Sequence, residues 1–343
     1  MTRTNKSLAY VLKACLGFGL AFMLGLGMTL EQTNAAPPLA KVAETRGTYS
    51  LSLPLVTQGT AQVSSLASDW LIYLNYYRSL AGLPGVAESQ EWNLGGHYHA
   101  RYTVKNDILV HGENVNNEWF TPEGSAAAES GNLMASSDPQ SSDTYAIDAW
   151  MQAPFHALGI LDPALLLVGF GSYREPDGGF QMGATLDVLR GLGEITEGVV
   201  FPVIWPADGT VVPIGKFWGE TPDPLTSCAG YSAPTGLPLI LQVGAGEQEP
   251  VVNAHSIMQG STLLEHCMFT ENTYMNPDSA AQDKGRAILD MRDAIILIPR
   301  DPLTPGGRYT VSIEVDGSTY VWTFEVGGPQ AQAVQSLNNV EIR

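Results

Sequence analysis

The chain has 343 residues, of which 44% are hydrophobic, and its 17 basic residues face 35 acidic ones, for a formal net charge of −18. This composition predicts a folded, acidic protein. Its 36 glycines and 22 prolines indicate a chain rich in loops. The composition excludes a basic nucleic-acid-binding protein. An acidic surface repels phosphate backbones, so we expect no nucleic acid among the partners.

The first 35 residues have the organisation of a secretory signal peptide. Basic residues precede an uncharged run over residues 14–30, and the small residues of 33–35 follow it as a cleavage site. We therefore expect a secreted, extracellular protein without a stable membrane span after cleavage. An uncleaved membrane anchor is the alternative, although a span normally needs about 20 apolar residues.

A leader or linker over residues 36–65 precedes a first domain that we place at 66–192. Apolar residues recur at three- and four-residue steps in three segments, which predict helices, and two later runs predict the strands of a hairpin: residues 66–81, 92–106 and 144–152 for the helices, and 165–172 and 179–188 for the strands. Gly95 and Gly96 would weaken the second helix unless a close neighbour needs the space. Helices followed by strands indicate an α+β domain.

The helical period disappears after Gly193, and short apolar runs separated by turn residues predict an all-β, immunoglobulin-like sandwich over residues 194–328. These runs are 199–205, 237–243, 287–289, 294–298, 309–315 and 320–326. Tyr309 is expected to bury its ring and bond back to the preceding loop. Residues 329–343 are expected to form a flexible tail.

Cys228 and Cys267 remain after removal of the signal peptide. They form either a disulfide or two buried thiols, and the sequence leaves both readings open. A cysteine-based zinc site is disfavoured, because the chain has no CxxC pair.

Two histidines of the first domain are placed where chemistry is expected. His111 and Glu113 are two residues apart, so that an extended backbone puts both on one face. His156 follows the break at Pro154, where a loop can direct the ring into a cleft.

These histidines belong to an ordered set of motifs that resembles the CAP superfamily, which groups cysteine-rich secretory proteins, antigen 5 and pathogenesis-related proteins, and in particular its bacterial SCP-domain branch. The set covers roughly residues 66–188 and consists of Leu-Asn-Tyr-Tyr-Arg at 74–78, Ala-Gly-Leu at 81–83, His99-Ala100, His111, the run from Ala146 to His156, and Val-Gly-Phe-Gly at 168–171. The Trp-Met-x-x-Pro-x-His stretch that ends at His156 is its strongest part.

The resemblance implies an α-β-α sandwich with a cleft in which two histidines and acidic residues hold a divalent metal, often zinc. His111 and His156 match the two histidines, and Glu113 or Glu129 is the expected third partner. Two neutral imidazoles, a carboxylate and a water would satisfy tetrahedral Zn²⁺. The carboxylates depart from the family pattern, because Gly131 and Ala153 stand where the family has its cleft glutamates.

We therefore expect an α+β chain, an α-β-α CAP domain followed by the β-sandwich, whose function is non-catalytic binding of a lipid, a small ligand or a partner protein outside the cell. A metal-dependent extracellular hydrolase is the alternative, although HExxH and GxSxG motifs are missing. In a third reading the first domain is a scaffold and the sandwich binds the partner.

Overall fold

The structure is a computed structural model that describes residues 68–328 and 340–343. These residues belong to one compact unit. The predicted signal peptide at 1–35, the leader at 36–65 and most of the predicted tail lie outside the described residues. In the part of the chain that is described, no helix has the length and apolar character needed to cross a membrane.

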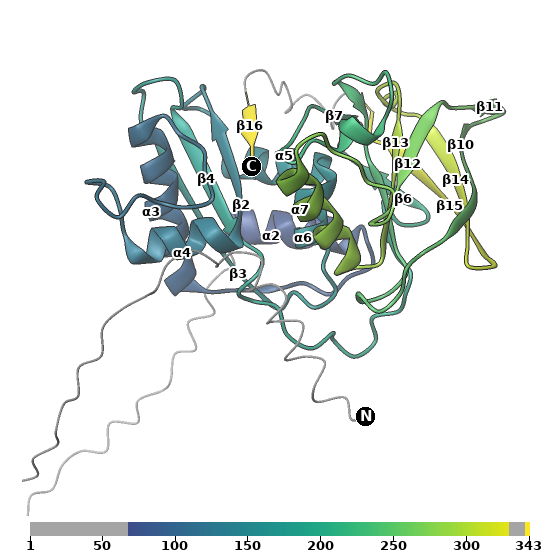
Figure 1. Ribbon diagram of the computed structural model, residues 1–343, viewed down its shortest axis with the longest axis horizontal. Helices are drawn as coiled ribbons and strands as arrows, with labels where there is room; N and C mark the ends of the chain where they lie inside the picture. Colours follow the sequence, from purple (N-terminus) through teal and green to yellow (C-terminus); the bar gives the residue numbers. More distant parts are fainter. Residues whose placement is uncertain (1–67, 329–339) are drawn as a thin grey trace, which may run out of the picture. The chain divides into compact units, whose positions relative to one another are not determined.

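The first part of the chain is built on a five-stranded sheet (Figure 1). β3 and β4 form the hairpin that the sequence predicts, and all neighbouring strands are antiparallel except β1 and β3. The strands, in their order across the sheet, are β1 (Ala87–Glu88), β3 (Leu167–Arg174), β4 (Met182–Asp187), β2 (Gly131–Ser136) and β16 (Val340–Ile342).

Helices cover both faces of this sheet. Successive residues of β3 point to opposite faces and contact different helices. The Phe170 ring stacks on Trp70 and meets the edge of Trp150, while a side chain at Gly169 or Gly171 would collide with the opposite helix, α3. The expected α-β-α layering is thus present. One face carries α3 (Gln90–Asn106) and α4 (Pro122–Ser130); the other carries α2 (Asp69–Ser79) and α5 (Asp143–Gln152), which leads into α6 (Pro154–Ile160).

The two glycines inside α3 are there because their neighbours need the space. A Cβ atom on Gly96 would lie 2.7 Å from the backbone nitrogen of Gly171, and one on Gly95 would lie 2.6 Å from the carbonyl oxygen of Glu123. The helix therefore packs backbone to backbone against β3 and α4, as the glycine pair predicts.

The second part of the chain is rich in β-structure, as expected, and its strands form two larger sheets and one small one. The first sheet, in order, is β11 (Thr262–Leu263), β10 (Val252–Gln259), β14 (Arg308–Val315), β15 (Ser318–Val326) and β6 (Thr210–Val212). The second is β12 (His266–Phe269), β13 (Ala294–Pro299), β9 (Leu239–Gln242) and β5 (Val203–Trp205), and the third pairs β7 (Lys216–Phe217) with β8 (Thr235–Gly236).

Two local predictions in this region can be checked directly. The Tyr309 ring is buried, and its hydroxyl oxygen accepts a hydrogen bond from the Thr304 backbone N–H at 2.7 Å, which confirms the predicted tie. Cys228, which follows the short 3₁₀ helix η1 (Pro224–Ser227), is joined to Cys267 of β12 by a disulfide. The open choice between a disulfide and two thiols is thereby decided.

The prediction that no helix follows Gly193 is wrong. Residues 279–290 form helix α7 (Ser279–Asp290), which includes the run at 287–289 expected as part of a strand. Asp278 caps it by accepting hydrogen bonds from the N–H groups of Ala280 and Ala281. A helical signal was present in the sequence, because Ala280, Ala287 and Met291 recur at helical spacing, but the interpretation of 287–289 as part of a strand overlooked it.

The predicted tail also needs correction at its end. Residues 340–342 form β16, which pairs antiparallel with β2 and buries Ile342. An unpaired strand edge is a template for a further strand, which explains why a short segment takes regular structure here.

Candidate functional site

His111 lies in the loop between α3 and α4. Its Nδ1 donates a hydrogen bond to the carbonyl oxygen of Ala128 at 2.9 Å, because a carbonyl can only accept, and Nε2 therefore carries the lone pair of the neutral ring. Burial, together with the positive charge of Lys284, lowers the pKa of His111 to about 3. The ring is neutral at physiological pH and presents an acceptor.

His156 lies near the start of α6 and is fixed by a residue from outside the first domain. Its Nδ1 is 2.6 Å from Oε2 of Glu220, in the loop after β7. The same carboxylate accepts hydrogen bonds from the backbone N–H groups of Phe155 at 3.0 Å and His156 at 3.2 Å. Burial raises the pKa of Glu220, and the bonds with His156 and Phe155 oppose this effect by favouring the ionised form.

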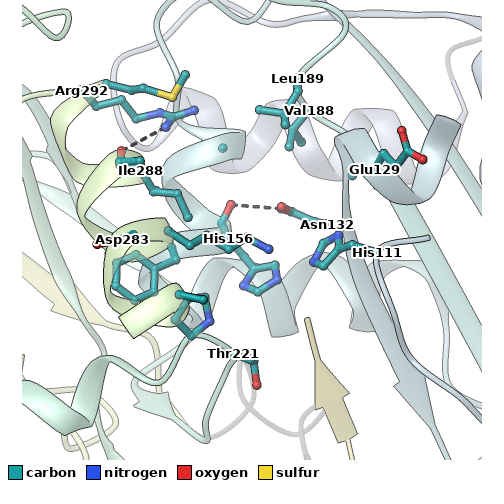
Figure 2. Close-up of a pocket in the computed structure, with 18 residues that line it drawn as sticks. His111, Glu129, Asn132, His156, Val188, Leu189, Thr221, Asp283, Ile288 and Arg292 are labelled. Atoms are coloured by element: carbon teal, nitrogen blue, oxygen red, sulfur yellow. Dashed lines mark hydrogen bonds between the residues drawn. The ribbon is translucent and has the colours of Figure 1, made fainter. Parts of the chain in front are cut away.

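Asn132 holds the main chain of the same histidine. Its amide Nδ2 donates to the carbonyl oxygen of His156 at 3.0 Å, a bond drawn in Figure 2. β2 and α6 are thereby tied together beside the rings of His111 and His156. With Nδ1 of each ring bound to the protein, Nε2 is the nitrogen left for a ligand.

Glu113, one of the two carboxylates expected at the cleft, lies elsewhere. Its Oε1 is 3.0 Å from Nδ1 of His99, and its Oε2 accepts the Thr121 N–H at 2.9 Å. Both members of the His99 and Glu113 pair are buried, and neither lines the cavity described below. Glu113 therefore orders the loop around His111 instead of facing a ligand.

Glu129, the other expected carboxylate, lies on α4 at the rim of the cleft. It is exposed, and the Ser125 hydroxyl donates to it at 3.3 Å. Figure 2 shows its carboxylate pointing away from the rings of His111 and His156. The structure thus brings together the two predicted histidines, with Glu129 at the edge.

A cavity of about 590 Å³ separates these histidines from helix α7 (Figure 2). Its walls are mainly aliphatic and aromatic. Val188 and Leu189 line it after β4, Phe155 lines it on α6, and Ala287 and Ile288 line it on α7. The imidazoles of His111 and His156 add polar groups to this apolar space.

Two cations of the β-rich region also line the cavity. Arg292 is buried, and its charge is matched by Asp162 at 2.8 Å, while Nη1 donates to the carbonyl oxygen of Ile288 at 3.2 Å. Lys284 extends from α7, close enough for its charge to act on His111, and burial lowers the pKa of its ammonium group. The cleft is therefore formed jointly by both parts of the chain.

The donor atoms around the cavity can be compared with what zinc requires. Zinc is held by three or four protein side chains in most sites, and the cavity offers two imidazole Nε2 atoms. Among residues 68–328 and 340–343 no group of three histidine, cysteine, aspartate or glutamate side chains is placed to hold a metal ion. The described residues do not fit a resident zinc ion without a further donor, and zinc at His111 and His156 stays a prediction.

Sequence reasoning missed Glu220 and Lys284, which together set the chemistry of the cleft. Glu220 stands in Gly-Glu-Thr-Pro, which matches no motif, and Lys284 lies on the helix that the sequence did not predict. One signal was available for Glu220. With Gly131 and Ala153 in place of the family's glutamates, a carboxylate from another segment was needed to bind the buried Nδ1 of His156.

Comparison with known proteins agrees with this geometry. The model of the Cysteine-rich secretory protein family, CAP, matches residues 71–188, and no curated protein matches the chain. The matched segment contains both histidines and the helices and strands of the α-β-α layers, apart from the first two residues of α2 and the edge strand β16. Proteins with this domain are commonly extracellular and non-catalytic. Residues 71–188 of this chain are a CAP domain, and Glu220 and helix α7 from outside it complete its cleft.

Proposed function

We propose that the protein is a non-catalytic binding protein that acts outside the cell and holds one small amphipathic ligand, of lipid-like character, in the cavity between α6 and α7. The observation that carries the proposal is the cavity itself. A volume of about 590 Å³ lies within the range of roughly 300–1,000 Å³ typical of small-molecule sites.

The distribution of side chains supports an amphipathic ligand. Val188, Leu189 and Ile288 offer apolar walls, whose contact with a hydrocarbon contributes about 25 cal/mol per Å² of buried area. His111 and His156 each present Nε2 to a polar group of the ligand, and their orientations are already fixed by hydrogen bonds. Such preorganisation lowers the entropy cost of binding.

The test is displacement of 1-anilinonaphthalene-8-sulfonate, bound in the cavity, by dodecanol and dodecanoic acid, followed by fluorescence. The variant Ala287→Phe fills the cavity from α7 and is expected to weaken binding of all three probes at least tenfold. Ala281→Phe adds the same side chain to the same helix at a position that does not line the cavity, and it should bind as the wild type does.

The outcomes distinguish the cavity from other apolar surfaces. Equal binding by the wild type and by Ala287→Phe would place the probes elsewhere and contradict the proposal. Absence of binding of all three probes to the wild type would contradict it as well.

A hydrolase is the second candidate, and the bond between Glu220 and His156 favours it. A carboxylate that binds Nδ1 of a histidine fixes the tautomer in which Nε2 can take a proton from water. Turnover of p-nitrophenyl esters that is lost in His156→Ala, and kept in Ala281→Phe, would favour this candidate over simple binding.

A further inference from the structure

The two histidines of the β-rich region lie side by side, outside the CAP domain. His255 belongs to β10 and His266 to β12, which are strands of different sheets. Nδ1 of His255 is 2.8 Å from Nε2 of His266, and the ring centroids are 4.9 Å apart at an interplanar angle of 73°. The polypeptide between them, which contains β11, turns back at the edge of the first sheet.

The protein fixes the orientation of His266. Nδ1 of this ring is 2.8 Å from the carbonyl oxygen of Leu264, which can only accept a hydrogen bond. The proton of the neutral ring is therefore on Nδ1, and Nε2 directs its lone pair toward His255. Histidines that bind metals typically use one ring nitrogen for the ion and bind a backbone carbonyl or a carboxylate through the other.

The spacing of the two nitrogens indicates the kind of ion. At a metal–nitrogen distance of about 2.0–2.1 Å, two imidazole nitrogens lie about 2.9 Å apart when they subtend a right angle, and about 3.3 Å apart at the tetrahedral angle. The observed 2.8 Å fits the right angle. Adjacent ligands at right angles are typical of square-planar and tetragonal sites, which Cu²⁺ and Ni²⁺ prefer, and Cu²⁺ binds nitrogen ligands more tightly.

We propose that His255 and His266 form a two-histidine binding site for Cu²⁺ on the β-rich region. The ion replaces the hydrogen bond between Nδ1 of His255 and Nε2 of His266. It lies to one side of the line that joins the two nitrogens, about 2.0–2.1 Å from each after the rings turn toward it, and water completes its coordination. His255 is exposed, so that its Nε2 can carry the displaced proton in contact with solvent.

The surroundings are favourable for a cation. The formal net charge of −18 attracts cations to the protein surface.

The test is titration of the tag-free protein with CuCl₂ at pH 7.5, followed by calorimetry and by electron paramagnetic resonance. The wild type should bind Cu²⁺ at this site with couplings from two imidazole nitrogens. His255→Asn and His266→Asn should each lower the affinity at least tenfold. His97→Asn is the matched control, because His97 lies on α3, away from both histidine pairs of the argument, and bonds to Ser172.

Three results would overturn the proposal. Unchanged copper affinity in both His255→Asn and His266→Asn is the first, and copper binding lost only in His111→Ala or His156→Ala is the second. The third needs no variant and is therefore independent of any folding defect: a wild-type resonance spectrum without couplings from two imidazole nitrogens.

Discussion

The CAP domain contributes the two histidines of the cleft, whereas the β-rich region contributes many of the groups that surround them. His111 is anchored within the domain, by the carbonyl oxygen of Ala128, but His156 is anchored by Glu220 and the cavity is closed by α7. A family motif therefore identifies the position of this cleft, while its chemistry depends on residues that no motif includes.

The largest expected change in the free energy of unfolding comes from removing Glu220, the residue that anchors His156. Glu220→Ala should lower the free energy of unfolding by about 3–5 kcal/mol, because Nδ1 of His156 and two backbone N–H groups lose their acceptor in a buried place. Guanidinium unfolding measures the change. Glu265→Ala is the control, since its bond to Arg300 is exposed and is expected to contribute less than about 1 kcal/mol.

Glu220→Gln refines the same test. Its amide keeps the shape and one acceptor oxygen, so the loss should be smaller than in Glu220→Ala. If both variants unfold within about 1 kcal/mol of the wild type, the β-rich region does not anchor the cleft in the way we describe.

The second effect originates in the β-rich region, because the disulfide lies there. The double variant Cys228→Ser/Cys267→Ser should lose about 3–4 kcal/mol, the loop-closure entropy for the 39-residue separation of the two cysteines. Unfolding is followed with and without a reducing agent. The wild type should become less stable on reduction, and the double variant should not respond; an unaffected wild type would contradict the assignment.

The two regions also differed in what could be predicted. In the CAP domain, α2, α3, α5 and the β3–β4 hairpin were predicted from the spacing of their apolar residues, whereas α4 and β2 were not predicted. In the β-rich region α7 was missed although Ala280, Ala287 and Met291 recur at helical spacing, because the run at 287–289 was interpreted as part of a strand.

The candidate site divides in the same way. His111 and His156 could be predicted from their motifs. Glu113 was assigned to the cleft because His-x-Glu spacing places both side chains on one face of an extended segment. The backbone there is not a regular strand, and Glu113 turns to His99 instead. Glu220 needed the tertiary structure, since it lies 64 residues from the histidine that it binds.

A third prediction uses pH to compare buried carboxyls in the two regions. Asp148 of the CAP domain accepts hydrogen bonds from the Tyr73 and Tyr77 hydroxyls, but neither carboxyl oxygen of Glu271 meets a partner from another described residue. Burial raises the pKa of Glu271 to about 7 from its usual 4.5. Ionisation of Glu271 is therefore less favourable in the folded protein than in the unfolded chain. The free energy of unfolding decreases progressively as the pH rises from about 4.5 through 7.

Glu271→Gln should remove this cost. Relative to the wild type, it should be more stable by about 2 kcal/mol at pH 8 and nearly equal at pH 4. Urea unfolding at both pH values measures the difference. A gain that is the same at both would show that the effect is not due to ionisation.

The smallest effect concerns the influence of α7 on the cleft. Lys284→Met removes a positive charge that lowers the pKa of His111, so this pKa should rise above about 3, while burial, the larger cause, keeps it below 6.5. A nuclear magnetic resonance titration of the histidine ring protons measures it. Lys216→Met, a lysine beside Trp218, is the control and should leave the His111 titration unchanged.

The strand β16 connects residues 340–343 both to the CAP sheet and to the loop that carries Glu220. The Arg343 N–H and carbonyl exchange hydrogen bonds with Leu133 of β2, and the carbonyl oxygen of Ile342 accepts the Thr221 N–H, one residue from Glu220. Removal of this short segment would expose the edge of β2 to neighbouring molecules. It would also remove a hydrogen bond from the loop whose Glu220 binds His156. A protein or label fused directly after Arg343 would disturb the pairing of β16 with β2, so labels for binding experiments are better attached elsewhere.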